Sequence, residues 1–307
     1  MTIFQALMAI GKNNSLVNYS YIQQQRIIRA NEHNELASNY IKSGEYQKAS
    51  THYKISLNTT IQELGENHLL VAKIYAKLGF SCAKLENYEE AITYFQKASS
   101  INKTLHGIKH ISVALNNNNI AESYKALGDY DKALEYYDLA LLSKGDLFDK
   151  NYKLMAIIYD NIAATNENLG SHKEAFESYL KACLIRRKYF GEDNFSTAES
   201  LLHLKEAIKE IYKYSEDTSE YIKESISILI HTENLRSSDL SFLMKYNILS
   251  EEDTPIATML MSDNPQNASY IEGPVDINSF PVAEVRSFPI ATTINEVQIY
   301  LVGEDSA

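Results

Sequence analysis

The residues of this chain that could bind a metal ion or act as a nucleophile are its eight histidines and two cysteines. His106 and His110 are the only histidines close together in sequence, and no third ligand follows at the spacing of a zinc site. Cys82 and Cys183 lie in no nucleophile motif, and the chain has neither a glycine-rich phosphate loop nor an HExxH motif. We therefore expect no enzyme, no metal site and no cofactor, and we interpret both cysteines as packing residues.

Asparagine and lysine side chains favour recognition of a partner over catalysis. Residues 116–119 are four consecutive asparagines, and Asn161 follows Asn119 by 42 residues. An asparagine amide offers both a donor and an acceptor, so it can hydrogen-bond to an extended peptide backbone. Lys73 and Lys77 lie four residues apart and add positive charge on one side of a helix. The alternative interpretation is that the two lysines are simply exposed to solvent on the surface of a helix.

These side chains must be positioned by helices, because the chain repeats with a period of 42 residues and no insertion. In each repeat an alanine precedes a large aromatic residue by four positions: Ala49 and Tyr53, Ala91 and Phe95, Ala133 and Tyr137, Ala175 and Tyr179. An earlier apolar position is followed directly by a small residue, as in Leu36–Ala37, Leu78–Gly79, Ile120–Ala121 and Ile162–Ala163. Glycines mark two turns in most repeats, although Glu86 replaces one of them. The pattern predicts two closely packed helices per repeat.

The pattern resembles the tetratricopeptide repeat, and the period with "NNIAESYKALGDYDKALEYYDLAL" is similar to the repeats of kinesin light chains. The resemblance covers four good copies, about residues 33 to 191, and a degraded fifth copy keeps Tyr214 and Tyr221 in register. It implies an all-α fold, a right-handed α-solenoid of helix-turn-helix repeats. The first helix of each repeat is then expected to line a concave groove.

The resemblance also implies a role for the asparagine column. In similar repeats, the asparagine at the position of Asn119 and Asn161 holds the main chain of a bound peptide. By register, the same face is expected to carry Asn118, Asp160, Lys73, Lys77, Phe80, Lys84 and Lys125. Asn116 and Asn117 are interpreted as solvated residues of an early helical turn. We therefore predict a non-catalytic scaffold that binds a protein or an extended peptide.

The formal charge of −11 is concentrated near the C-terminal end. The segment from Thr232 to Ala307 holds 12 of the 40 acidic residues, 3 of the 29 basic residues and all five prolines. We predict one or more N-terminal capping helices over residues 1–30, a repeat solenoid over 31–231 and an acidic, poorly structured tail over 232–307 that is partly helical at its start. The nearly neutral body excludes a nucleic-acid partner or a membrane-surface role, since both need a basic surface.

The N-terminal residues and the cysteines indicate the cellular location, and two alternative functions remain. The apolar run "MTIFQALMAI" lacks the features of a signal peptide, and two unpaired cysteines suit a reducing cytosol, so we expect a cytoplasmic protein. One alternative is a bacterial effector that a specialised secretion system delivers into a host cell. Another is a peptide-sensing regulator. We also predict an intramolecular contact between the acidic tail and the lysines of the groove.

Overall fold

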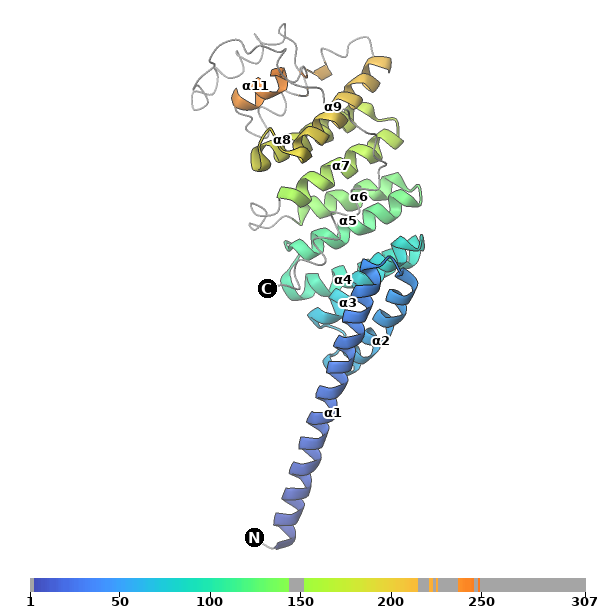
Figure 1. Cartoon of the computed structure of the whole chain (residues 1–307), viewed down its shortest axis with the longest axis vertical. Helices are drawn as coiled ribbons and strands as arrows, with labels where there is room; N and C mark the ends of the chain where they lie inside the picture. The colour runs from blue at the N-terminus through green and yellow to red at the C-terminus, as the bar shows by residue number, and fades with distance from the viewer. Residues whose placement is uncertain are drawn as a thin grey trace. The chain divides into compact units, whose positions relative to one another are not determined.

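A computed structural model describes residues 3–143, 152–214, 221, 222, 225, 237–245 and 248. These residues form helices joined by short turns, and they contain no strand. The helices are α1 (Ile3–Lys42), α2 (Tyr46–Leu64), α3 (Leu69–Lys84), α4 (Tyr88–His106), α5 (Ile111–Ala126), α6 (Tyr130–Leu142), α7 (Tyr152–Asn168), α8 (His172–Phe190), α9 (Phe195–Tyr214) and α11 (Ser237–Lys245) (Figure 1). They fall into two compact units that divide after Asn151, unit 1 with α1–α6 and unit 2 with α7, α8, α9 and α11.

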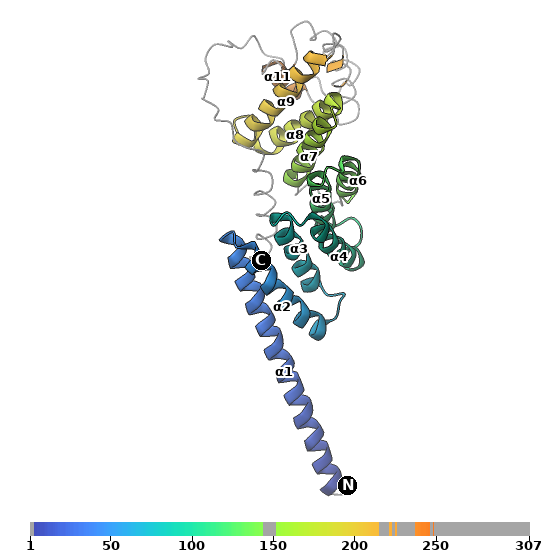
Figure 2. The same ribbon diagram turned by 90° about the vertical axis from the view of Figure 1, so that its right-hand side faces the viewer.

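Unit 1 is a stack of three helix hairpins, α1–α2, α3–α4 and α5–α6 (Figure 2). The second helix of each hairpin also packs against the first helix of the next one, α2 against α3 and α4 against α5. This arrangement confirms the predicted all-α, helix-turn-helix repeat fold. Each hairpin corresponds to one 42-residue repeat.

The tight turns inside the hairpins require a left-handed backbone. Gly44 and Gly128 adopt φ angles of 78° and 77° in the turns of the first and third hairpins. Glu86 occupies the same position in the second hairpin and adopts φ 61°. A side chain is strained in this region because its Cβ crowds the neighbouring backbone. The departure seen in the sequence is therefore tolerated at a cost in stability.

The core of each hairpin is made by the small and aromatic columns of the repeat. In unit 1, Ala37 and Ala49 lie against Tyr53, and Ile74 and Leu78 of α3 complete this cluster. All five side chains are buried, as the period predicts. The small residues are needed because two helix backbones approach each other closely at these positions.

Gly79 is the tightest example of this close approach. A Cβ atom built on Gly79 would lie 2.9 Å from ring carbons of Phe95. The other repeats have alanine in this column, as in Ala37 and Ala121. The second repeat therefore matches a smaller residue on α3 with the ring on α4.

The first helices begin with a side-chain cap in three of the repeat junctions. The Nδ1 atoms of His68 and His110 accept hydrogen bonds from the backbone N–H groups of Leu70 and Ser112, at 3.1 and 3.2 Å. Asn194 Oδ1 accepts the equivalent bond from Ser196 at the start of α9, at 2.9 Å. These bonds satisfy backbone donors that a helix leaves free at its first turn.

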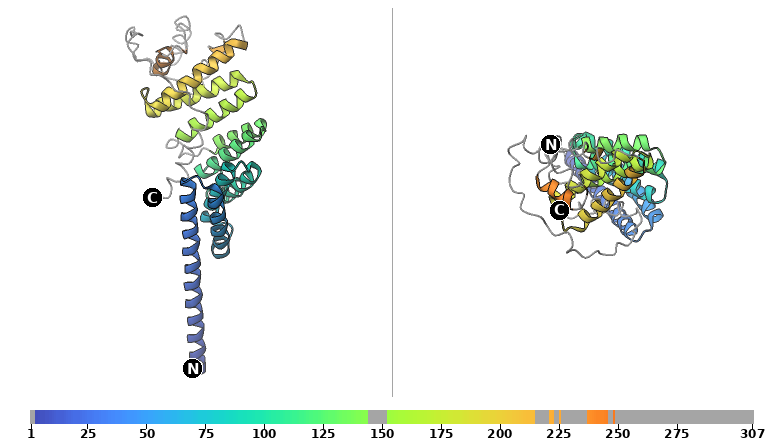
Figure 3. Two further views of the ribbon diagram at one scale, coloured as in Figure 1. Left: turned by 45° about the vertical axis from the view of Figure 1, so that its right-hand side comes forward. Right: turned by 90° about the horizontal axis from the view of Figure 1, so that it is seen from above.

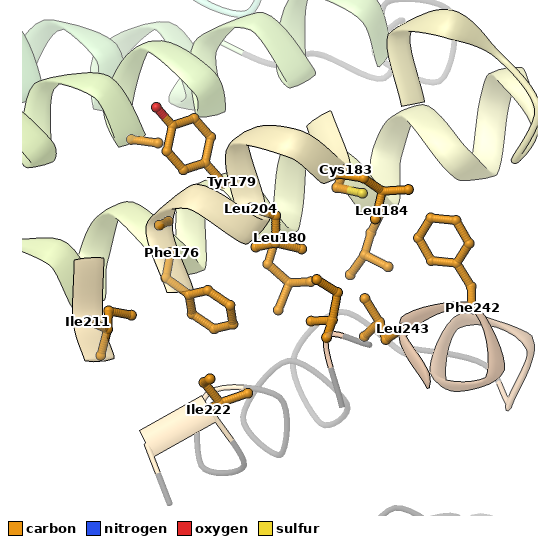
Figure 4. Close-up of a cluster of buried hydrophobic side chains, with 14 residues drawn as sticks. Phe176, Tyr179, Leu180, Cys183, Leu184, Leu204, Ile211, Ile222, Phe242 and Leu243 are labelled. Carbon is orange, nitrogen blue, oxygen red and sulfur yellow. The ribbon is translucent and has the colours of Figure 1, made fainter. Parts of the chain in front are cut away.

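The described part of unit 2 contains the hairpin α7–α8, followed by α9 and α11. Figure 4 shows a hydrophobic cluster of this unit, in which Phe242 and Leu243 of α11 pack beside Leu184 of α8. Leu204 of α9 and Ile222 belong to the same cluster. α11 lies within the segment predicted as the tail, and its apolar residues contribute to this cluster of unit 2.

One of the two predicted domain boundaries falls inside a helix. α1 runs without a break across residues 30 and 31, and it extends far beyond its partner α2 (Figure 3). The N-terminal capping segment and the first repeat are therefore parts of one helix. The predicted boundary at residue 231 and the segment after residue 248, including the predicted tail contact, lie outside the described residues.

Candidate partner-binding surface

The residues predicted to bind a partner lie on the first helices of three repeats. Unit 1 carries Lys73, Lys77, Phe80 and Lys84 on α3 and Asn118, Asn119 and Lys125 on α5, and unit 2 carries Asp160 and Asn161 on α7. Their surroundings differ, so each group is described by itself.

Lys77 belongs to a polar cluster at the junction of the first two hairpins. Its Nζ atom lies 3.3 Å from Ser38 Oγ on α1 and 5.9 Å from the ring centroid of Tyr53 on α2. Ser38 Oγ is in turn 3.1 Å from the Tyr53 hydroxyl. Tyr53 is buried, whereas Ser38 and Lys77 are half-buried. We call Ser38, Tyr53 and Lys77 the first-repeat cluster; it places a cation and two hydroxyl groups at one edge of the first helices.

The third repeat has a related cluster that is already charge-paired. Lys125 Nζ donates to Glu122 Oε1 at 2.7 Å, and the Tyr137 hydroxyl donates to the same oxygen. Lys125 was expected on the same face as the other predicted residues. Its ion pair with Glu122 neutralises its charge.

The tyrosine hydroxyl of the fourth repeat also meets a carboxylate. Tyr179 donates to Glu167 Oε2 at 3.0 Å. Burial, with the nearby Glu167 carboxylate, raises the pKa of Tyr179. The phenol therefore stays protonated and acts as a hydrogen-bond donor.

The asparagine stretch of α5 lies inside unit 1. Asn116 and Asn117 are buried, and Asn117 Oδ1 accepts a hydrogen bond from Ser99 of α4 at 3.3 Å, so the interpretation of these two residues as solvated is wrong. Asn118 is also fully buried, which removes it from the surface where it was expected. Asn119 is 8% exposed, and its buried side-chain nitrogen makes no hydrogen bond within the described part of the chain.

Asp160 was expected on the concave face but forms a buried ion pair. Its carboxylate accepts a hydrogen bond from Arg186 of α8, and Arg186 also donates to Ser200 Oγ of α9 at 2.6 Å. The pair holds three helices of unit 2 together, which corrects the expected surface role of Asp160. Asn161, the next residue, is buried as well.

The aromatic and basic residues at the end of α3 form a stack. Phe80 is buried and meets the ring of Tyr46 edge-on, with 6.2 Å between centroids. Lys84 Nζ lies 5.5 Å above the Phe80 ring, and burial lowers the pKa of Lys84. Phe80 is therefore not the exposed apolar patch that was expected. Lys73 is half-buried in the first turns of α3.

The cysteines are buried, and two of the histidines stack on each other. Cys82 and Cys183 are buried and unbridged, and burial raises the pKa of each thiol to about 12. Neither is therefore a thiolate nucleophile at neutral pH. His106 and His110 stack with 4.3 Å between ring centroids. Within the described residues, no three histidine, cysteine, aspartate or glutamate side chains gather as metal ligands would.

Among the helices of the described residues, none combines the length and the apolar character that crossing a membrane requires.

Ser38 and Glu122 were not among the residues predicted to bind a partner. They occupy the same position of the first and third repeats, and the second and fourth repeats have Phe80 and Ala164 there. This position varies in chemical character while its neighbours are repeated, and such variation is the signal that could have identified both residues.

No curated protein matches this chain. Two family models described as tetratricopeptide repeat match, one at residues 28–104 and 70–141 and the other at residues 155–196, which together make up just over half of the chain.

Solved structures share the fold. A putative kinesin light chain from Podosopora anserina with nearly identical TPR-like repeats is 18% identical, with a TM-score of 0.52 over 67% of this chain and 98% of that one. BtubC (BKLC) from P. vanneervenii is 18% identical, with a TM-score of 0.54 over 92% and 97%. The apo form of RapI is 15% identical, with a TM-score of 0.52 over 77% and 83%. With its repeat columns, hairpins and family matches, this chain belongs to the tetratricopeptide repeat family.

Proposed function

We propose that this protein is a non-catalytic scaffold that binds an extended peptide or a partner protein on the first helices of its repeats. The observation that carries the proposal is a shared column in unit 1. Lys77 on α3 and Asn119 on α5 occupy equivalent positions of adjacent repeats. Lys77 is half-buried beside two hydroxyl groups, and the amide nitrogen of Asn119 makes no hydrogen bond within the described residues.

The chemistry of these groups suits a peptide main chain. An amide with a free donor can hold a backbone carbonyl, and a lysine ammonium supplies three donors for carbonyl or carboxylate oxygens. A buried donor without a partner is costly, so binding that satisfies the Asn119 amide gains free energy. Family membership supports the proposal, since tetratricopeptide repeats typically act as binding scaffolds.

The proposal is tested by selection of peptides on the full chain, followed by affinity measurements on variants. Random displayed peptides are enriched on the wild-type protein, and the best are measured by fluorescence anisotropy. We expect Lys77→Met and Asn119→Ala each to weaken binding about tenfold, the range for one hydrogen bond to a charged or buried group.

Lys103→Met is the matched control, because Lys103 is an exposed lysine on α4, a second helix. Circular dichroism establishes that each variant keeps its helices. Equal affinities for all three variants and the wild type would contradict a binding surface on the first helices of unit 1.

A further inference from the structure

The helix α1 continues well beyond the helix that covers it. Within the described residues, α2 is the helix that packs against α1. Near the C-terminal end of α2, Gln23 donates to the Glu63 carbonyl at 3.2 Å and Arg26 pairs with the Glu63 carboxylate at 2.9 Å. Figure 3 shows the N-terminal part of α1 extending past this end of α2. Helices in proteins gain most of their stability from the packing of one face, so this extension lacks the contacts that would stabilise it.

The face of α1 that packs against α2 can be followed along the helix. Ala30 is buried there, and the Nδ1 atoms of His33 and of His52 on α2 lie 2.9 Å apart. Gln23 and Arg26 continue this face towards the N-terminus. In a heptad written abcdefg, the α1 residues of this face occupy positions c and f. Positions a and d therefore lie on the opposite side of α1.

An apolar heptad pattern follows that opposite side. The a and d positions of residues 3–28 number eight, and six of them hold Ile3, Leu7, Ile10, Val17, Tyr21 and Ile28. We call these eight positions the α1 seam. Tyr21 and Ile28 are 61% and 42% exposed. Apolar residues at this spacing are typical of helices that pair as a coiled coil.

The residues that flank the α1 seam indicate what binds it. Positions e and g carry no charged residue anywhere in residues 3–28. The two charged residues of this stretch, Lys12 and Arg26, occupy position f, away from the seam. Two identical copies can therefore meet along the seam without charge repulsion. A strongly acidic or basic helix would find no complementary charge there.

The polar residues of the α1 seam favour a particular arrangement of the two copies. Asn14 occupies an a position between Ile10 and Val17, and Gln24 occupies a d position. In a parallel pair of identical helices in register, each amide meets its own copy, and each offers both a donor and an acceptor. A single asparagine at an a position costs stability but specifies register and oligomeric state.

We propose that the α1 seam binds the α1 seam of a second copy of this chain, as a parallel two-stranded coiled coil over residues 3–28. The paired segment spans nearly four heptads and is about 39 Å long at 1.5 Å per residue. Because the seam lies opposite the face that packs against α2, pairing leaves the first hairpin intact. The heptad pattern ends where Asn31 and Glu35 take the next two seam positions, inside that hairpin. This inference does not depend on the proposed peptide-binding function.

The test is the mass of the full chain in solution, measured by light scattering during size-exclusion chromatography over a dilution series from micromolar protein upwards. We expect twice the chain mass of 34.8 kDa. The mass of a single chain at every concentration would overturn the proposal. A mass of four chains would overturn the two-stranded arrangement.

A pair of double variants locates the interface. Ile10→Glu with Val17→Glu places two charges in the seam of each copy and is expected to give the mass of a single chain. Gln5→Glu with Tyr19→Glu is the matched control, because it adds the same two charges at f positions and should leave the dimer intact. Circular dichroism establishes that both variants keep the helices of the repeats. A seam variant that remains a dimer, or a control that dissociates equally, would contradict the α1 seam as the interface.

A cysteine variant tests the register by a gain of function. In a parallel pair in register, the two thiols of Asn14→Cys face each other, and mild oxidation is expected to give a covalent dimer. Lys12→Cys is the control, because its thiols lie on the sides of the two helices that face away from each other, and it should give no such product. A dimeric Asn14→Cys protein that forms no cross-link would overturn the parallel arrangement in register.

Discussion

Units 1 and 2 are built from the same repeat, but they use the polar residues of their first helices differently. In unit 2, the side chains of Asp160 and Arg186 are 12% and 8% exposed, and their ion pair lies inside the helix stack. In unit 1, the ion pair of Lys125 and Glu122 is 19% and 22% exposed, at the edge of the stack. The two ion pairs occupy different columns of the repeat: Asp160 is equivalent to Asn118, which is buried as well, and Lys125 is equivalent to Glu167, which is half-buried.

The first helix of unit 1 and the last described helix of unit 2 differ in how their apolar residues are covered. In unit 2, Arg187 of α8 pairs with Asp239 of α11 and lies 4.7 Å from the centroid of the Phe242 ring. Unit 1 begins with α1, where Leu36 is 40% exposed although the equivalent Leu78 is fully buried. A terminal repeat lacks a neighbour on one side, so it must either be covered or become polar there.

The largest effect is expected from a break in the buried ion pair of unit 2. Asp160→Ala leaves the Arg186 guanidinium buried without its carboxylate, and the loss of one partner from such a pair costs about 3–5 kcal/mol of unfolding free energy. Hydrogen exchange followed by mass spectrometry should show faster exchange in α7, α8 and α9, with α1–α4 unchanged.

The matched control is Lys125→Ala in unit 1, which breaks a more exposed ion pair and should cost about 1 kcal/mol or less. A double replacement, Asp160→Leu with Arg186→Met, removes both charges and should recover most of the loss. Equal costs for Asp160→Ala and Lys125→Ala would contradict the contrast between the units.

The next effect concerns the packing of the second repeat in unit 1. Gly79→Ala places a methyl group against the ring of Phe95, and overpacking of this kind costs about 1–3 kcal/mol. Urea denaturation measures the loss. Phe95→Leu in the same chain should return part of it, because the smaller side chain makes room. An unchanged midpoint in Gly79→Ala would show that the ring moves freely.

Much of the fold could be predicted from the sequence because it rests on repeated residues. The alanine, aromatic and small-residue columns predicted helix pairs with Tyr53, Phe95 and Tyr137 buried, and all three are. Periodicity is informative here because burial of a column follows from close packing between identical hairpins.

The candidate site could be predicted only in part. Register placed Lys77 and Asn119 on first helices, but the face assigned to Asn118 and Asp160 was wrong. These two residues share one column, and Ala76 in the same column is buried too, so their burial is common to the repeats. The column does not predict the partner of each side chain, such as Arg186 for Asp160.

A smaller loss of stability is expected at the start of α5. There the capping histidine can be replaced by asparagine, the residue type that caps α9 in unit 2. His110→Ala removes the side-chain acceptor for the Ser112 N–H group and should cost about 1 kcal/mol of unfolding free energy. His110→Asn should retain most of the stability, because Asn194 makes the equivalent bond in unit 2. Thermal melting of the two variants side by side measures the difference. If both melt alike, the cap does not stabilise α5.

The smallest effect is expected in the turn between α3 and α4, and it is a gain. Glu86 adopts φ 61° where the equivalent residue in unit 2, Gly170, adopts φ 73°. Glu86→Gly relieves the crowding of Cβ in the left-handed region but adds freedom to the unfolded chain, so the net stabilisation is about 0.5–1 kcal/mol. The reverse change at Gly128, Gly128→Ala, should destabilise by a similar amount, because a Cβ there meets no atom within 4 Å and the backbone angle alone opposes it. Urea denaturation of both variants separates the two outcomes. A loss of stability in Glu86→Gly would mean that the side chain, not the φ angle, determines the stability of this turn.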